Sequence, residues 1–308
     1  MMKPTKKKVT TAVASMAAVT FLGGCSQLLL LNPKGPIGVS ERFVILVSIG
    51  LMLIVVIPVI VMVLWFPQKY RASNPKSTYA PHWNRSAPIE LVIWLVPAVI
   101  ITILGVLIWQ NTYRLDPYRP IETAVPPIRI EAVSLDWKWL FIYPDQNIAA
   151  VNELVFPVDV PLSFRLTSAS VMTSFFIPQL GSQIYAMAGM QTRLHLMAHE
   201  AGTYLGQNQQ FSGSGYAEMN FKAIATSRKD FDAWVEKIGR SGQPLDAARY
   251  EQLAAPSADN PVAHFRLVRS NLFDSVVNQF KTTAGPENAA VDRGPSDRPA
   301  QTVALEKP

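Results

Sequence analysis

Two long uncharged segments precede a region of short, alternating segments in this chain. Residues 43–66 and 91–109 contain no Asp, Glu, Lys or Arg. At 1.5 Å per residue, the first run exceeds the ~30 Å hydrocarbon core of a bilayer, and the second is just long enough to cross it. We therefore expect a transmembrane helix hairpin over residues 43–112, with its connecting loop at 67–89.

The loop at 67–89 has no acidic residue and four basic ones: Lys69, Arg71, Lys76 and Arg85. Cytoplasmic loops beside transmembrane helices carry such an excess of basic residues. The loop is therefore predicted to be cytoplasmic. The segment before the hairpin and everything after about Tyr113 then lie on the outer side.

After a proline-rich linker, the apolar positions change to a period of two, which is typical of β-strands. The alternation reverses its phase once within residues 128–139, and this predicts a β-bulge inside one strand. Several short strands at such spacing predict an all-β sandwich over residues 113–226. Further strands are expected at 152–156, 162–167, 174–177, 192–197 and 219–225.

From Ser227 the pattern becomes helical. Ser227 and Asp230 fit a capping box, and four apolar residues then recur on one helix face: Phe231, Trp234, Val235 and Ile238. Further helices are expected over Leu245–Ala254 and after Asn271, so residues 227–281 are predicted to form a small helical, aromatic-rich C-terminal segment. Residues 282–308 show no periodicity and are predicted to be a disordered tail.

The first 24 residues have the build of a secretory signal peptide, with four lysines followed by a short apolar run. The run ends in Leu22-Gly23-Gly24-Cys25, which resembles the lipobox of bacterial lipoproteins, whose Cys becomes diacylated. Cys25 is the one cysteine of the chain, so we expect it to be the lipidated mature N-terminus, followed by an external segment at 25–42. The alternative is a signal anchor with a chance Cys.

Composition favours a membrane protein, because 49% of the residues are hydrophobic and 16% are charged. The formal net charge of +6 comes mostly from residues 1–24, which hold four lysines and no acid; without them, 24 basic side chains face 22 acidic ones. No basic stripe with interleaved aromatic residues remains to indicate a nucleic-acid partner.

Residues 171–219 resemble the copper-bearing region of subunit II of the haem-copper respiratory oxidases. In the cytochrome c oxidases of that family, a V-x-H-S-F-x-I-P segment and a G-x-Y-x-G-Q turn precede the ligand sequence C-x-E-x-C-x3-H-x2-M. The scaffold residues of this pattern are present: Val171, Ser174, Phe175, Ile177, Pro178, Leu180, Gly181, Gly202, Tyr204, Gly206 and Gln207. The resemblance implies the cupredoxin version of the β-sandwich.

The ligand positions of that pattern hold other residues. Thr173 and Tyr216 replace the two His, Asn208 and Ser212 the two Cys, Gln210 the Glu, and only Met219 is retained. Thiolate-bridged and blue-copper centres need soft sulfur ligands, which hydroxyl and amide groups cannot replace. We therefore expect no metal in this chain. The aromatic cluster at 136–139, which aids electron transfer beside the copper in the family, is then expected to serve packing.

Two histidines, His195 and His199, lie four residues apart on a predicted strand and could face the same side. A third ligand at a suitable spacing is missing. We interpret both as polar positions at a strand end rather than as metal ligands.

Residues 84–100 resemble the second-helix pattern of the family, an acid followed by W-x-x-P: Glu90, Trp94 and Pro97. In the family, this Glu lies where protons enter a pathway into subunit I from the cytoplasm. The alternative is an acid that stabilises the positive end of a helix dipole. The matching Trp and Pro favour the first interpretation of Glu90.

Over residues 22–280, the resemblance implies subunit II of a cytochrome bo-type ubiquinol oxidase. The assembled enzymes of that kind oxidise ubiquinol, reduce O2 to water and pump protons. The haems and copper are then expected in subunit I. This chain would itself carry no redox centre and no catalytic residue, because a quinol in the bilayer needs no external copper relay.

The resemblance therefore implies a membrane-anchored α+β protein of the bacterial inner membrane. It would cap subunit I and associate with subunits III and IV. The missing ligands exclude a working cytochrome c oxidase subunit II. The remaining alternative is a stand-alone membrane lipoprotein whose copper-less cupredoxin domain acts in binding or assembly; the Glu90 pattern argues against it, because an independent anchor needs no acid for proton uptake.

Overall fold

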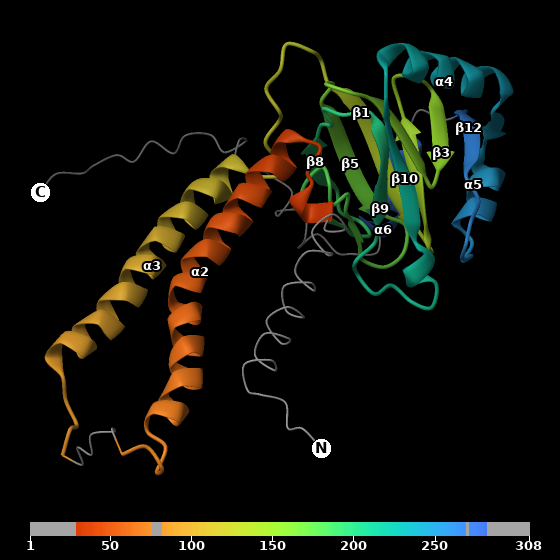
Figure 1. Ribbon diagram of the computed structural model, residues 1–308. Coiled ribbons are helices and arrows are strands. Elements are labelled where there is room, and N and C mark those ends of the chain that lie inside the picture. The colour runs from red at the N-terminus through yellow and green to blue at the C-terminus, as the bar shows by residue number, and fades with distance from the viewer. Residues whose placement is uncertain (1–28, 76–81, 269–270, 282–308) are drawn as a thin grey trace, which may run out of the picture.

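Two long helices lead into a β-sandwich in the computed structural model of the chain (Figure 1). The structure describes residues 29–75, 82–268 and 271–281. Helix α2 spans Pro36–Lys69 and helix α3 spans Ala87–Arg114. Both are long and apolar enough to cross a membrane, which confirms the two predicted spanning helices.

Three sheets form the external domain. The large sheet has the strand order β11-β12-β3-β2-β1-β5-β8, the second has β4-β10-β9, and the third pairs β6 with β7. The strands are β1 Ile128–Leu135, β2 Lys138–Tyr143, β3 Ile148–Val151, β4 Glu153–Pro157, β5 Leu162–Ser168, β6 Thr173–Phe175, β7 Ile184–Ala186, β8 Thr192–Leu196, β9 Gly202–Gln207, β10 Asn220–Thr226, β11 Gln243–Leu245 and β12 Ala263–Leu267. The sandwich is therefore confirmed, and five of its strands (β4, β5, β6, β8 and β10) lie where the alternation predicted them.

The β-bulge predicted within residues 128–139 is wrong. Leu135 pairs with Lys138, so the chain reverses between them and β2 runs back along β1. Strand β1 keeps an unbroken register with β5 over residues 128–134. The apparent change of phase arises because both faces of β1 are buried, one against each of two cores: Ile130 and Ala132 in the first, Val133 and Leu135 in the second.

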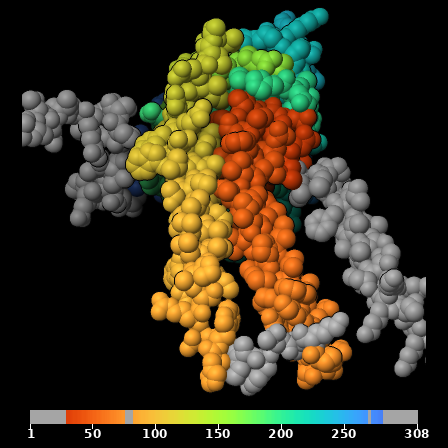
Figure 2. Space-filling view, turned by 60° about the vertical axis from the view of Figure 1, so that its left-hand side comes forward, coloured from red at the N-terminus to blue at the C-terminus, as the bar shows by residue number. Residues whose placement is uncertain are grey.

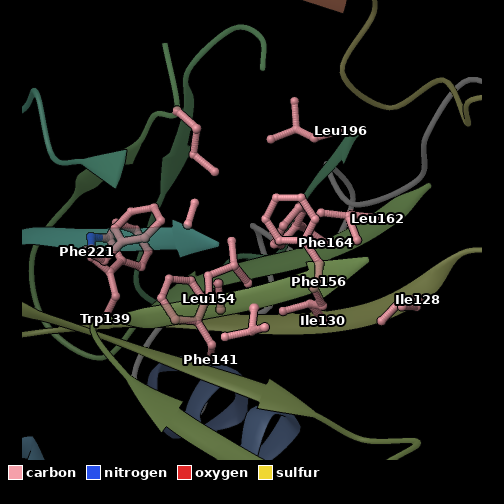
Figure 3. Close-up of a cluster of buried hydrophobic side chains, with 14 of the residues drawn as sticks. Ile128, Ile130, Trp139, Phe141, Leu154, Phe156, Leu162, Phe164, Leu196 and Phe221 are labelled. Atoms are coloured by element: carbon pink, nitrogen blue, oxygen red, sulfur yellow. The ribbon is translucent and has the colours of Figure 1, made fainter. Parts of the chain in front are cut away.

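The first core lies between the large sheet and the β4-β10-β9 sheet, and Figure 3 shows its aromatic side chains gathered between the strands. Trp139, Phe175 and Phe221 are at most 2% exposed. The rings of Phe175 and Phe221 stack at 5.1 Å, and Trp139 meets Phe175 edge to face at 5.3 Å. Each such pair contributes about 0.5–1.5 kcal/mol beyond its buried area. Trp139 therefore packs the core, as the sequence predicts.

The later part of the C-terminal segment covers the opposite face of the large sheet, whereas Phe231 and Ile238 of its first helix pack into the first core. Helix α4 (Arg228–Ser241) begins at the predicted cap, where the Ser227 hydroxyl accepts a hydrogen bond from the Asp230 N–H. Helices α5 (Ala247–Ala254) and α6 (Leu272–Lys281) follow. The residues of this second core are Val133, Leu135, Leu140, Ile142, Ala149, Val151, Leu245, Phe265, Leu272, Phe273, Val276 and Val277.

The C-terminal segment is not helical throughout, which corrects the prediction. Strand β12 pairs with β3, and β11 pairs with β12, so both extend the large sheet. Leu245 belongs to β11, and the Asp246 side chain caps α5 only after it. Strand β11 has only three residues and is too short to show a period, whereas β12 does alternate, with apolar Ala263, Phe265 and Leu267 around two polar residues, and the sequence interpretation overlooked it.

A charged cluster fastens α6 to the second face of the sheet. Glu131 on β1 is 7% exposed and accepts a hydrogen bond from Arg165 Nη1 at 2.7 Å. Arg165 also donates to Asp274 of α6 at 2.6 Å, and its guanidinium lies 4.6 Å from the centre of the Phe273 ring. Burial raises the pKa of Glu131, and the charge of Arg165 opposes that rise.

A buried lysine holds α5 against the same region. The side chain of Lys138 is 1% exposed, and its amine donates to the carbonyls of Leu253 and Ala255 at 2.9 and 2.8 Å. These carbonyls lie at the C-terminal end of α5, where a cation satisfies free acceptors and interacts favourably with the helix dipole. Desolvation lowers the pKa of Lys138.

The outer end of α2 is docked directly on the sandwich. Backbone hydrogen bonds join Lys34 N to the Gln179 carbonyl at 2.7 Å, Gly38 N to the Leu180 carbonyl at 3.2 Å, and His199 N to the Lys34 carbonyl at 2.8 Å. In Figure 2, the two helices stand together as a stalk below the sandwich, with the first turns of α2 pressed against it.

A glycine, a hydrogen bond and an ion pair complete the contact between the start of α2 and the sandwich. A Cβ at Gly35 would collide with the Met197 carbonyl, so only glycine fits there. The Ser182 hydroxyl donates to the Glu41 carboxylate, and Lys34 pairs with Glu200. The sandwich is thereby held at a defined place on the membrane helix.

Replacing Arg165 by Ala should leave the Glu131 carboxylate buried without its cation. Because Arg165 is itself 36% exposed, the expected loss in the free energy of unfolding is about 1–3 kcal/mol. The folded-state pKa of Glu131 already lies above its ordinary value, so protonation favours the folded state. The free energy of unfolding that Arg165→Ala loses should therefore become smaller as the pH falls toward 5.

Urea unfolding of the purified chain in detergent, followed by near-ultraviolet circular dichroism, measures this effect. Arg240→Ala is the matched control, because it removes only an exposed pair with Glu236 within α4. Equal losses for the two variants at neutral pH would contradict a buried role for Arg165.

Candidate functional site

The loop between β9 and β10, residues 208–219, holds most of the former ligand positions. It includes the short turn η3, Tyr216–Glu218. In Figure 1, it lies at the lower end of the sandwich, on the side toward which the two helices run. Thr173 approaches from β6, because the β6 residue Ser174 is hydrogen-bonded to Asn208 at the start of this β9–β10 loop.

Asn208 is the centre of the β9–β10 loop. Its side-chain oxygen accepts hydrogen bonds from the Ser174 N–H at 2.9 Å, the Ser174 hydroxyl at 3.3 Å and the Gln210 N–H at 3.0 Å. Its amide nitrogen donates to the Gln210 carbonyl at 2.8 Å and the Ser212 hydroxyl at 3.1 Å. Asn208 and Ser212, which stand at the two former cysteine positions, are therefore joined by a hydrogen bond.

Two further hydroxyls are buried beside Asn208. Thr173, at the first former His position, is 2% exposed and donates to the Ser134 hydroxyl at 2.7 Å. The Ser174 hydroxyl accepts from the Gln209 N–H at 2.7 Å. The site thus satisfies its buried polar groups internally, as folded proteins generally do.

Trp137 holds the β9–β10 loop from the other side. Its indole N–H donates to the Ser212 carbonyl at 3.0 Å. A Cβ at Gly215 would lie 2.6 Å from the indole, so the ring and the loop backbone are in close contact. Trp137 has a φ of 62°, a left-handed conformation that bulky residues rarely adopt, and these contacts stabilise it.

Met219 and Tyr216 lie in different surroundings. The Met219 side chain is 1% exposed in the first core. Tyr216, at the second former His position, is 37% exposed, and its ring meets that of Phe211 edge to face at 5.1 Å. The retained ligand position is therefore a core residue, whereas the replaced one is at the surface.

The donor atoms of this site do not fit a copper centre of the family's kind. The former cysteine positions supply an amide and a hydroxyl, and both are engaged with each other. Among the residues that the structure describes, no group of three His, Cys, Asp or Glu could hold a metal ion. The chemistry of the site is that of a hydrogen-bonded support for a loop.

His195 and His199 have separate surroundings. His195 is 8% exposed on β8, and burial lowers its pKa. His199 follows the strand, is exposed, and its Nδ1 lies 2.7 Å from Asp159 Oδ1. One is thus a buried and the other an exposed polar position; that neither binds metal stays a prediction.

Glu90 lies in the first turn of α3, far along the chain from the β9–β10 loop. Its carboxylate is 46% exposed and lies 3.7 Å from Arg85 Nε. Cys25 is outside the described residues. The structure thus brings Asn208 and Ser212 together and places Thr173 next to Ser174, which bonds Asn208, but leaves Glu90 at the other end of the hairpin.

Of the residues that support the site, Ser174 was identified from the family pattern, but Ser134 and the role of Trp137 were missed. The signal for Ser134 is a hydroxyl residue between the apolar Val133 and Leu135. The contact of Trp137 with residues 212–215 had no signal, because it joins positions about 75 residues apart in a left-handed turn.

Asn208→Ala should leave several buried partners without a hydrogen bond. The expected loss in the free energy of unfolding is about 2–3 kcal/mol, and the amides of residues 208–219 should exchange faster with deuterium. Hydrogen exchange followed by mass spectrometry measures the second effect. Gln209→Ala is the control, because the exposed Gln209 side chain supports nothing in the network while its N–H is retained; unchanged exchange in the Asn208 variant would contradict the central role of this amide.

Two segments of the chain match models of known protein families. A family model described as "Cytochrome C oxidase subunit II, periplasmic domain" matches residues 144–225, and one described as "COX Aromatic Rich Motif" matches residues 240–282. The first match includes most of the sandwich and the β9–β10 loop, and the second covers the segment over the second core.

Curated relatives match almost the whole chain. It is 52% identical to cytochrome bo(3) ubiquinol oxidase subunit 2 of Pseudomonas aeruginosa, over 90% of this chain and 83% of that one. It is 51% identical to the protein of the same name from Pseudomonas putida, over 85% and 83%. It is 48% identical to ubiquinol oxidase subunit 2 of Acetobacter aceti, over 89% and 91%. The chain belongs to the family of ubiquinol oxidase subunits 2, the second subunits of an oxidoreductase complex.

Proposed function

We propose that this chain is the metal-free second subunit of a proton-pumping ubiquinol oxidase, in which ubiquinol is oxidised and O2 is reduced to water. The haems and copper of such a complex then belong to the partner subunit I, and subunits III and IV complete it. The observation that carries the proposal is the Asn208–Ser212 hydrogen bond at the two former cysteine positions. It supports a subunit that keeps the fold of an electron-accepting domain without its redox chemistry.

The proposed role of the external domain is to cap subunit I. The docked joint between α2 and the sandwich supports it, because the domain is then held in one orientation above the bilayer. The β9–β10 loop lies at the lower end of the sandwich, toward which the two helices run (Figure 1), and its Phe211 is 70% exposed, which supports a contact of this end with subunit I. Two membrane-capable helices and a match to a periplasmic domain support an inner-membrane location with the sandwich in the periplasm.

Glu90 is proposed to take up protons from the cytoplasm for the partner subunit. It lies in the first turn of α3, beside Arg85 and directly before the uncharged run 91–109, which supports a position at the cytoplasmic boundary of the bilayer. A carboxylate there can exchange protons with the cytoplasm. The neighbouring Arg85 is 82% exposed, so its pairing with Glu90 is weak and does not block such exchange.

Glu90→Gln is expected to slow ubiquinol oxidation per haem severalfold while assembly and haem content stay normal, because an amide cannot carry the proton. Glu90→Asp should retain more of the activity. Steady-state oxygen consumption of the purified complex measures this. Glu122→Gln, at an exposed acid beyond α3, is the control. Wild-type turnover in Glu90→Gln would leave only a helix-dipole role, worth about 0.3–1 kcal/mol of stability.

Copper loading tests the metal-free site. After incubation with copper and desalting, the purified chain should retain no stoichiometric metal, because no thiolate lies in the loop. Metal analysis by mass spectrometry gives the ratio. The Cys25→Ala variant controls for adventitious binding to the one thiol of the chain. One tightly held equivalent in that variant would overturn the assignment.

Cys25 is proposed to be the acylated N-terminus of the mature chain. The lipobox-like sequence before it supports this. Mass spectrometry of the mature N-terminus should find a lipid-modified Cys25, whereas Cys25→Ala should still sit in the membrane through its two helices. An unmodified N-terminus upstream of Cys25 would refute the proposal.

A further inference from the structure

The segment before α2 folds back along the helix. The short turn η2, Leu29–Leu31, is closed by a hydrogen bond from Asn32 N to the Leu29 carbonyl at 3.2 Å. Arg42 Nη1 then donates to the Leu31 carbonyl at 3.4 Å. Figure 1 shows this turn beside the upper part of α2 rather than above it. The Leu31 carbonyl therefore lies within the reach of the Arg42 side chain, and the uncharged run begins at the next residue, Phe43.

The leucines of η2 are not packed into the protein. Leu29 is 38% exposed and Leu30 is 46% exposed, and no residue of the turn is buried. On the adjacent helix, Phe43 and Leu46 are 62% and 50% exposed, as lipid-facing residues are. The turn contacts α2, so its leucines continue the apolar surface of the membrane helix toward the periplasm.

The position of η2 is fixed from the other side by the sandwich. Gln179 Nε2 donates to the Asn32 carbonyl at 3.4 Å, and Lys34 N donates to the Gln179 carbonyl at 2.7 Å. Rotation of the turn to bury its leucines against the sandwich would break these bonds. The exposed leucines are therefore a consequence of how the segment is held.

We propose that the η2 turn is a membrane anchor that inserts Leu29 and Leu30 into the outer leaflet of the bilayer, at the boundary between headgroups and acyl chains. Apolar side chains at this depth bind lipid, and an arginine beside them, here Arg42, places its charge among the headgroup phosphates. The lipid surface is the favoured partner because the turn is continuous with the surface of a membrane-spanning helix. The anchor acts independently of quinol oxidation and of the proposed role of Glu90.

Spin labels on the full chain test this anchor. In a Cys25→Ala background, a label is placed at Leu30→Cys, or at Leu29→Cys if the first variant does not fold. The chain is reconstituted in vesicles of phosphatidylethanolamine and phosphatidylglycerol. The label at position 30 should collide more with oxygen, which dissolves in lipid, than with a water-soluble nickel chelate. Phe43→Cys is the lipid reference, and Lys229→Cys, exposed on α4, is the water reference.

Two outcomes would overturn the proposal. A collision ratio at position 30 equal to that at position 229 would place the turn in water. Shielding from both reagents in the assembled oxidase would show that a partner subunit, not lipid, covers the leucines. A ratio close to that at position 43, both in the separate chain and in the assembled oxidase, supports the lipid anchor.

Discussion

The shape of the β9–β10 loop depends on one buried amide. Asn208 joins the loop to β6 through Ser174 and closes the loop on itself through Gln210 and Ser212. In a copper centre, the metal would hold these positions together. Here, five hydrogen bonds of one side chain do so, and this requires no thiolate.

The turn between β1 and β2 links this loop to the rest of the domain. Trp137 supports the β9–β10 loop, and the next residue, Lys138, points to the carbonyls at the end of α5. The β1–β2 turn and the residue after it therefore hold both the β9–β10 loop and the C-terminal segment in place. Hydrogen bonds from the start of α2 fix the sandwich relative to the helix in addition.

The periodic parts of the fold could be predicted from the sequence, and the parts that depend on distant contacts could not. The uncharged runs identified both membrane helices, and Ser227 with Asp230 identified the start of α4. The phase change in β1 was misread as a bulge, because one sequence cannot show that a second layer buries the other face of a strand. That layer comes from residues more than 100 positions later, such as Leu272 and Val276.

The residues of the candidate site could be predicted from the sequence, but the contacts between them could not. The replaced positions Asn208 and Ser212 were identified from the family pattern, and their chemistry followed from their side chains. The hydrogen bond between Asn208 and Ser212, and the support from Ser134 and Trp137, depend on how the β1–β2 hairpin, strand β6 and the β9–β10 loop meet.

We propose that this chain acts only as part of an oxidase whose redox centres lie in another subunit. The most direct measurement is the haem content and ubiquinol-dependent oxygen consumption of material purified through a tag on this chain after mild detergent extraction. We expect haem to co-purify in a fixed ratio to the chain, with oxygen consumption that depends on ubiquinol. A pure, folded chain that carries no haem from cells with active ubiquinol oxidase would contradict it and favour a stand-alone lipoprotein.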